Sequence, residues 1–255
     1  MIDVFPVTLP RLTGRQQRRA YVYVPDAAQE HPESRYPVLY MFDGHNVFFD
    51  SDATYGKSWG MKDYLERTDT PLIVAAVECN HNPNNGRLSE YAPFTFQAEG
   101  LGRIHGRGKL TMAWMIEEFK PYVDAHYPTL PMREATFIGG SSMGGLMSLY
   151  ALLAHNDTFS RAAALSPSAW LCASRMNRLI REAEVAPDTV LYMDYGSREM
   201  ANHPGMLRTF SQMTARLMEK GLLVNSRIVP NGDHCEACWE EQLPFLMQTL
   251  LYERA

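Results

Sequence analysis

Hydrophobic residues of this chain gather in short continuous runs, and segments with the three-to-four-residue spacing of amphipathic helices lie between the runs. A continuous apolar run of a few residues, bounded by turn residues, is typical of a strand buried on both faces. Six runs have this form, at residues 38–42, 72–77, 135–138, 162–165, 190–195 and 224–229. A helix over 204–220, which ends at Gly221, is predicted between the last two runs. The alternation predicts an α/β fold with a mostly parallel central sheet and helices on both faces.

The first 24 residues have a different pattern. Residues 4–9 and 19–24 look like two strands, and in the second the tyrosines at 21 and 23 alternate with small apolar residues. The turn residues at 13–15 lie between them. We therefore expect an antiparallel N-terminal hairpin at one edge of the sheet.

Composition narrows the class of protein. No Pro- or Ser-rich linker divides the 255 residues, so we expect a single domain over residues 1–255. Lys and Arg total 24 against 29 Asp and Glu, and the net charge of −5 argues against nucleic acid or an anionic membrane as a partner. The first residues lack a charged segment followed by an apolar stretch, and no apolar run is long enough to span a membrane. We expect a cytoplasmic protein. The sequence allows a homo-oligomer but does not reveal the oligomeric state.

The most specific motif lies at residues 135–150, where an apolar run ends in GGSSMGG and a helix-forming run follows at once. This is the G-x-S-x-G pattern of a nucleophile elbow, centred on Ser142. A sharp turn needs neighbours without side chains, which explains Gly140 and Gly144 on either side. The hydroxyl then projects at a helix N-terminus, where backbone amides favour a developing negative charge. A phosphate-binding loop is excluded because no Lys-Ser or Lys-Thr pair follows the glycines.

A serine nucleophile needs a base, and where the serine occupies an elbow of this kind the chain order is Ser, then Asp or Glu, then His. Three histidines follow Ser142, namely His155, His203 and His234. His155 ends the helix that starts at the elbow, and His203 lies in a loop before the next helix. His234 follows the last predicted strand, after an Asn-Gly turn that can direct it toward Ser142. His234 is therefore the predicted base.

The acid is expected on the loop after the strand at 190–195, where two candidates occur. Asp194 is still inside the strand pattern, whereas Glu199 lies on the loop, where its longer side chain can bend back to the imidazole. We favour Glu199 and keep Asp194 as the alternative.

Acyl transfer also needs two hydrogen-bond donors for the oxyanion. One is expected to be the amide of Met143, directly after the nucleophile, and the other the amide of His45, where Gly44 allows a close backbone approach. Trp170 and Met200 flank the catalytic loops and, with Gly44, are candidates for the substrate pocket.

The segment His234-Cys235-x-x-Cys238 invites interpretation as a zinc or redox site. The remaining cysteines, Cys79 and Cys172, form no matching pair, so we expect no metal. We expect Cys235 and Cys238 to be buried thiols in a segment that opens a helix ending in Leu251.

Five segments in this order resemble the putative-esterase family of α/β-hydrolases: YMFDGHN at 40–46, GSSMGG at 140–145, LSPSAW at 165–170, GSRE at 196–199 and GDH at 232–234. That family includes esterase D (S-formylglutathione hydrolase), feruloyl esterases, enterochelin esterases and the antigen 85 mycolyltransferases. The resemblance runs from about residue 21 to residue 250. It implies an α/β-hydrolase fold in which Ser142 is the nucleophile, Glu199 the acid where many relatives have Asp, and His234 the base, with the His45 and Met143 amides as oxyanion hole. The chain departs from the family after the histidine, where CEACW replaces an apolar or aromatic run.

The sequence thus predicts a serine carboxylesterase that hydrolyses small acyl or aryl esters through an acyl-enzyme and needs no cofactor. Two alternatives use the same triad: an acyltransferase, in which an alcohol or thiol replaces water, and a thioesterase of the S-formylglutathione hydrolase type. A non-enzymatic binding protein on this fold is disfavoured, because the ordered serine, acid and histidine and both oxyanion positions are present.

Overall fold

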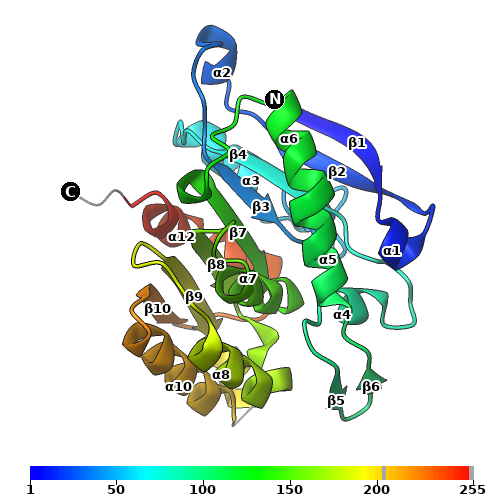
Figure 1. The fold of residues 1–255 in the computed structure, drawn as a ribbon, viewed down its shortest axis with the longest axis vertical. Coiled ribbons are helices and arrows are strands. Elements are labelled where there is room, and N and C mark those ends of the chain that lie inside the picture. Colours follow the sequence, from blue (N-terminus) through cyan, green and yellow to red (C-terminus); the bar gives the residue numbers. More distant parts are fainter. Residues whose placement is uncertain (203–204, 253–255) are drawn as a thin grey trace.

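A computed structural model describes residues 1–202 and 205–252 of the chain. Within these residues, eight strands form one sheet in the order β1-β2-β4-β3-β7-β8-β9-β10 (Figure 1). The strands are β1 Ile2–Thr8, β2 Gln17–Tyr23, β3 Val38–Met41, β4 Ile73–Val77, β7 Thr136–Ser141, β8 Arg161–Leu165, β9 Val190–Gly196 and β10 Leu223–Val229. All six predicted strands of the central sheet are present, and each begins within two residues of its predicted first residue.

The strand directions also follow the prediction. β1 and β2 pair antiparallel at one edge, β2 pairs antiparallel with β4, and all other neighbours in this sheet pair parallel. The turn of the hairpin contains a short helix, α1 (Pro10–Thr13), which the sequence pattern did not predict. In a parallel sheet the carboxyl ends of the strands share one edge, so the loops after β3, β4, β7, β8, β9 and β10 lie near one another.

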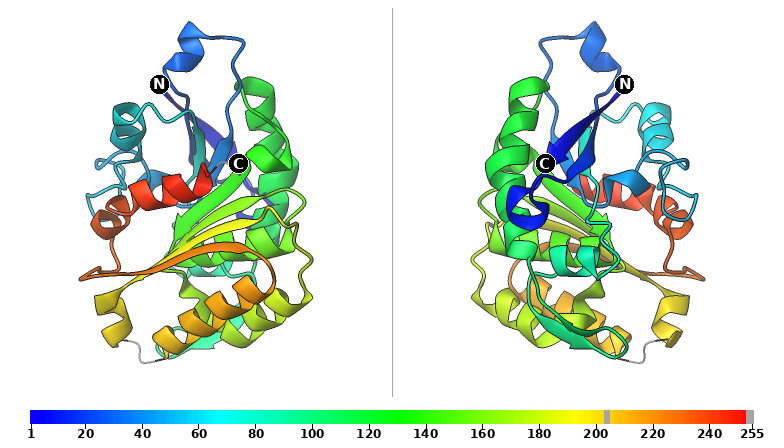
Figure 2. Two further views of the ribbon diagram at one scale, coloured as in Figure 1. Left: turned by 90° about the vertical axis from the view of Figure 1, so that its left-hand side faces the viewer. Right: turned by 90° about the vertical axis from the view of Figure 1, so that its right-hand side faces the viewer.

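Alternate residues of each strand enter two separate apolar layers. Tyr40 belongs to one layer, whereas Leu39 and Met41 on the same strand belong to the other. Helices over residues 108–114, 120–126, 143–154, 173–182 and 206–219 complete the first layer, and helices over residues 61–67, 236–240 and 243–250 complete the second. Figure 2 shows these two sets of helices on opposite sides of the sheet. The prediction of a sheet covered on both faces is therefore confirmed.

The helices have the following bounds. They are α1 Pro10–Thr13, α2 Ala27–Glu30, α3 Met61–Arg67, α4 Gly86–Glu90, α5 Gly108–Trp114, α6 Lys120–His126, α7 Met143–Ala154, α8 Ala173–Glu182, α9 Ser197–Asn202, α10 Met206–Glu219, α11 Glu236–Glu240 and α12 Leu243–Leu250. Shorter turns are η1 Gly44–Asn46, η3 Arg133–Ala135 and η4 Ser168–Cys172, and a π-helical turn, η2 Met115–Phe119, joins α5 to α6. No helix of residues 1–202 and 205–252 is both long and apolar enough to cross a membrane.

Two helical predictions need correction. The single helix expected up to Leu251 is two helices, because Pro244 in the first turn of α12 cannot donate the backbone bond that a continuous helix needs. The helix expected over 204–220 is α10, which starts at Met206; Pro204 and His203 lie outside the described residues.

The long connection between β4 and α5 is ordered. It contains α4 and a small hairpin of β5 (Phe96–Ala98) and β6 (Gly102–Ile104), which Figure 1 shows at one end of the molecule below α4. Its first part passes the carboxyl end of β4 and forms one wall of the cavity described below.

Candidate active site

Ser142 lies on the sharp turn between β7 and α7. Its φ and ψ angles are 58° and −120°, a strained conformation for a residue with a side chain. A Cβ atom on Gly140 would come within 2.9 Å of the Gly144 backbone, so the turn closes only because glycine occupies this position. The Ser142 amide donates to the Leu165 carbonyl, and the Ser142 carbonyl accepts from the Ser168 amide. These bonds hold the strained turn against the loop after β8.

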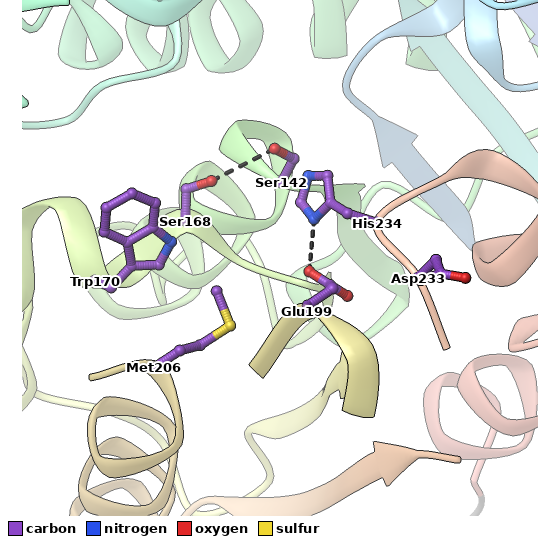
Figure 3. A pocket seen from close by; sticks show the side chains of 7 residues that line it. All are labelled: Ser142, Ser168, Trp170, Glu199, Met206, Asp233 and His234. Carbon is purple, nitrogen blue, oxygen red and sulfur yellow. Dashed lines mark hydrogen bonds and ion pairs between the residues drawn. The ribbon is translucent and has the colours of Figure 1, made fainter. Parts of the chain in front are cut away.

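Glu199 and His234 meet beyond the ends of β9 and β10. The Nδ1 atom of His234 lies 2.6 Å from Oε2 of Glu199 (Figure 3). The other carboxylate oxygen of Glu199 accepts hydrogen bonds from the Ser166 hydroxyl at 2.6 Å and from the Gly196 amide at 2.9 Å. The carboxylate is therefore fixed on both oxygens, and it holds one ring nitrogen of His234.

Hydrogen bonds keep Glu199 ionised. Burial by itself would raise the pKa of Glu199, but the bonds from His234, Ser166 and the Gly196 amide outweigh burial and lower the pKa below its ordinary value. Apart from His234, the donors are neutral groups. The negative charge is thus stabilised without being cancelled by a lysine or arginine.

Ser142 and His234 line the same two cavities, but no hydrogen bond joins them in the described part of the chain. The Ser142 hydroxyl instead lies 3.4 Å from the Ser168 hydroxyl (Figure 3). Catalytic hydrogen bonds are often long or absent without substrate, and a rotation of the Ser142 side chain would turn its hydroxyl from Ser168 toward the imidazole.

Two residues that support Glu199, namely Ser166 and Trp239, were not predicted as site residues from the sequence. Trp239 on α11 donates from Nε1 to the Ser166 hydroxyl at 3.1 Å, and Ser166 donates in turn to Glu199. The Trp239 ring also stands edge-on to the His234 ring, with centroids 5.1 Å apart. Ser166 itself has a left-handed backbone, with φ of 42°. The LSPSAW and CEACW segments contain these residues, yet no spacing in the sequence indicates that they meet.

Asp194, the alternative acid, has other partners. Its two oxygens accept from the Tyr192 hydroxyl at 2.8 Å and from the Ser166 amide at 3.2 Å. Burial raises the pKa of Asp194 to about 7. Asp194 therefore binds Tyr192 on its own strand and the amide of Ser166, 28 residues away in sequence, and these bonds occupy both of its oxygens.

The other side of Ser142 is formed by the loop after β3. Asp43, with φ of 56°, receives two hydrogen bonds of 2.7 Å from the guanidinium of Arg87. A Cβ on Gly44 would lie 2.9 Å from the Val77 amide nitrogen, so a glycine lets this loop pack directly against β4. Within the described residues, the amides of His45 and Met143 donate no hydrogen bond. Both amides are thus free to bind an oxyanion.

Two cavities flank the Ser142 and His234 side chains. The first, of about 360 Å³, is lined by Ser142, Ser168, Trp170, Glu199, Met206, Asp233 and His234. The second, of about 450 Å³, is lined by both catalytic candidates and by polar residues that include His45, Asn80, His81, Asn82 and Arg87. Figure 3 shows Trp170 and Met206 on the side of the first cavity away from His234.

The predicted pocket residues are only partly at these cavities. Trp170 lines the first cavity, but Met206 takes the place expected for Met200, which packs half-buried against the core. Gly44 lines neither cavity, because its backbone is pressed against β4. Met206 was missed because its position depends on how α10 packs, which periodicity does not reveal.

Comparisons with known proteins identify the family and the fold of this chain. A family model described as "Putative esterase" matches residues 13–248. The uncharacterized protein YbbA of Bacillus subtilis is 23% identical over 211 residues, which cover 80% of this chain and 79% of YbbA.

Solved structures share the fold at low sequence identity. An IroE-like serine hydrolase from Shewanella oneidensis has a TM-score of 0.74 at 17% identity, over 97% of this chain and 78% of that one. The BES protein from Bacillus cereus has a TM-score of 0.73 at 18% identity, over 99% and 95% of the two chains. An enterobactin and salmochelin hydrolase, IroE, has a TM-score of 0.67 at 20% identity, over 96% and 94%. These likenesses show an α/β-hydrolase fold.

Proposed function

The chain belongs to the putative esterase family and is a carboxylic ester hydrolase, and from this premise we propose that it is a serine esterase with Ser142, Glu199 and His234 as its catalytic triad. The observation that carries the proposal is the 2.6 Å contact between His234 Nδ1 and Glu199, in a cavity that Ser142 also lines. A carboxylate on one ring nitrogen leaves the other nitrogen as the proton acceptor for a serine.

The proposed reaction has two halves. In the first, Nε2 of His234 takes the hydroxyl proton of Ser142 while the serine oxygen attacks the ester carbonyl. The imidazolium returns this proton to the departing alcohol, and the acyl group stays on Ser142. In the second half, His234 takes a proton from water, the hydroxide attacks the acyl-enzyme, and Ser142 recovers its proton as the acid leaves.

Two groups of the site support the charges that arise in these steps. The negative oxygen of each tetrahedral intermediate would be held by the amides of His45 and Met143, which have no other acceptor in the described residues. The positive imidazolium would be stabilised by Glu199, whose lowered pKa keeps it ionised at neutral pH. The chemistry uses side chains and backbone amides of this chain, so we propose that no cofactor takes part.

The two cavities suggest how an ester binds. Trp170 and Met206 give the first cavity an apolar wall, which suits a small acyl or aryl group. The second cavity, with its histidines, asparagines and Arg87, suits the more polar part of the molecule. We therefore propose small acyl or aryl esters as substrates, acted on by one α/β-hydrolase domain in the cytoplasm, without nucleic acid or membrane as partner.

Replacing the nucleophile tests the proposal. We expect Ser142→Ala to lower the turnover of p-nitrophenyl esters by about 10⁵- to 10⁶-fold, because the acyl-enzyme cannot form. The matched control is Ser148→Ala, a buried serine on α7 that hydrogen-bonds the Gly144 carbonyl and lines neither cavity. Ser148→Ala should keep nearly all the turnover. Substantial turnover by a folded Ser142→Ala variant, judged by its thermal unfolding, would refute the assignment.

A further inference from the structure

His45, Cys79 and His81 come together at the wall of the second cavity. His45 lies on η1, after β3, and the other two lie on the loop that follows β4. One potential ligand atom from each residue lies within 4.8 Å of the other two. The close packing of Gly44 on Val77 brings the two loops together. No part of the proposed triad chemistry uses these three side chains.

The imidazole of His45 is held in an orientation that suits a ligand. Its Nε2 atom lies 3.0 Å from the Thr54 hydroxyl, and Thr54 is itself held by a 2.9 Å bond from its amide to Asn46 Oδ1. When Nε2 donates to Thr54, Nδ1 carries the lone pair. His45 is only 3% exposed, and this Nδ1 atom is buried with no hydrogen-bond partner in the described residues. A buried, unpartnered nitrogen is costly unless something binds to it.

Cys79 and His81, together with His45, form a set of soft and borderline donors. Cys79 is buried, is not in a disulfide, and has its Sγ atom 4.0 Å from Nδ1 of His81. The rings of His45 and His81 are 4.8 Å apart and nearly perpendicular. One thiolate and two imidazoles suit Zn²⁺ or Co²⁺ and are unsuited to Mg²⁺ or Ca²⁺, which prefer oxygen.

We propose that His45, Cys79 and His81 form a binding site for a divalent transition-metal ion such as Zn²⁺, with the second cavity open to the ion's fourth position. The geometry needs a modest adjustment. Ligand atoms around a tetrahedral zinc ion are roughly 3.3 to 3.6 Å apart, given Zn–S and Zn–N distances of about 2.3 and 2.0 Å. His81 is exposed, so its side chain can move inward by the remaining ångström or so.

Binding exchanges a proton for the metal. The thiol of Cys79 would release its proton to solvent as the sulfur–metal bond forms, because the thiolate is the form that binds the metal. His45 would bind through the lone pair of Nδ1 and keep the proton on Nε2, which it donates to Thr54.

The ion would act as an inhibitor of ester hydrolysis, and this part of the inference rests on the proposed function. Ser142 and His234 line the same cavity as the three ligands, and the amide of His45 is a proposed oxyanion donor. A metal on the His45 ring would tie η1 to the loop after β4 and occupy space intended for substrate.

The segment after His234 is a weaker candidate for a metal. Nδ1 of His234 is already bound to Glu199, and Cys238 is packed against Gly232. Within the described residues, His45, Cys79 and His81 make up the one group of three such side chains with this spacing.

A titration with Co²⁺, followed by absorption, tests the site without reference to activity. A cysteine thiolate bound to Co²⁺ absorbs in the near ultraviolet, and tetrahedral Co²⁺ gives intense visible bands. We expect both features in the wild-type protein and in Ser142→Ala. Cys79→Ala should abolish the near-ultraviolet band, and His81→Ala should weaken Co²⁺ binding by at least about tenfold, since even an outer-shell partner of a metal is worth that much.

Matched controls are Cys235→Ala and His105→Ala, the latter an exposed histidine on the same connection as His81. Both should keep the full spectrum. A wild-type protein without the thiolate band would overturn the proposal, as would a band that persists in Cys79→Ala and disappears in Cys235→Ala. Because Cys79 is buried, His81→Ala provides the independent check if Cys79→Ala does not fold.

Zn²⁺ inhibition of p-nitrophenyl ester hydrolysis tests the second part. Inhibition should be strong in the wild type and at least about tenfold weaker in His81→Ala, in line with its weaker metal binding. Spectroscopic binding of the metal with unchanged turnover would refute the inhibitory role alone, whereas loss of the triad assignment would leave the Co²⁺ result intact.

Discussion

The segments after β3 and β9 each place a buried carboxylate near Ser142, Asp43 on the loop after β3 and Glu199 in the first turn of α9, and the two carboxylates have opposite surroundings. Asp43 after β3 is bound by two nitrogens of the Arg87 guanidinium, Nε and Nη2, which hold the pKa of Asp43 below its ordinary value despite burial. Glu199 after β9 is bound by a hydroxyl, an amide and His234. The negative charge of Asp43 is neutralised by a cation, whereas that of Glu199 remains available to stabilise a positive imidazole.

This difference explains what each loop can do. An arginine–carboxylate pair with two parallel hydrogen bonds is rigid and directional, so it suits a loop whose backbone amide must stay in place. A carboxylate surrounded by neutral donors keeps its charge and can stabilise a positive imidazole next to it. A buried carboxylate thus fixes the backbone of a loop on one side of Ser142, and on the other side a buried carboxylate supplies the negative charge that stabilises the imidazole.

Asp194, at the same end of β9, is a third buried carboxyl group with yet other surroundings. It is as buried as Asp43, but it has no bidentate arginine and only two neutral donors, from Tyr192 and Ser166. Burial therefore dominates, and the pKa of Asp194 rises to about 7. Donor number and charge, more than burial, decide which of these carboxyl groups is ionised.

The largest effect is expected when the negative charge of Glu199 is removed. Glu199→Gln should reduce kcat for ester hydrolysis by about 10⁴-fold, because an amide can neither hold the productive tautomer of His234 nor stabilise its protonated form. Asp194→Asn is the matched control and should cost far less. The measurement is kcat at a temperature where both variants are folded.

The outcome also discriminates between mechanisms. If Asp194→Asn caused the larger loss, the acid role would pass to Asp194. Small and nearly equal losses in both variants would indicate a Ser-His pair that works without a carboxylate.

Much of this arrangement could be predicted from the sequence. The elbow at Ser142 is a local backbone signal, since only glycines permit the turn, and His234 and Glu199 follow from chain order once the strands are recognised. The choice of Glu199 over Asp194 depended on an expected loop beyond the strand. The expected loop is a helix, and Glu199 contacts the imidazole from the first turn of α9.

Other features depend on contacts between distant segments and were not predictable. Trp239 reaches Ser166 because α11 is a separate helix, and the sequence pattern suggested one continuous helix. His45 meets Cys79 because β3 and β4 are neighbours in the sheet, which periodicity alone does not determine. Single-sequence patterns describe elements well, whereas side-chain clusters arise from the packing of those elements.

A second, smaller effect is expected when the ion pair between Arg87 and Asp43 is broken. Arg87→Gln leaves Asp43 buried without its cation and should lower the free energy of unfolding by about 3 kcal/mol, near the lower limit for buried pairs because the Arg87 side chain is 31% exposed. Chemical denaturation measures this loss. Adding Asp43→Asn to Arg87→Gln should recover part of it, since the unpaired charge is then gone. If the double variant were no more stable than Arg87→Gln, the ion pair would not stabilise the loop after β3.

The smallest effect concerns Asp194 and the pH dependence of stability. A carboxyl group with a raised pKa in the folded state binds its proton more tightly there than in the unfolded chain. Its contribution to stability is complete below about pH 4 and is lost as the pH rises toward 7, by about 1.4 kcal/mol per pH unit. Asp194→Asn has no such proton, so its unfolding free energy should decline less steeply than that of the wild type between pH 5 and pH 6. Denaturation curves at the two pH values measure the difference. Parallel declines for the two proteins would mean that Asp194 is already ionised in the folded protein, and that two neutral donors suffice to hold a buried charge at the end of β9.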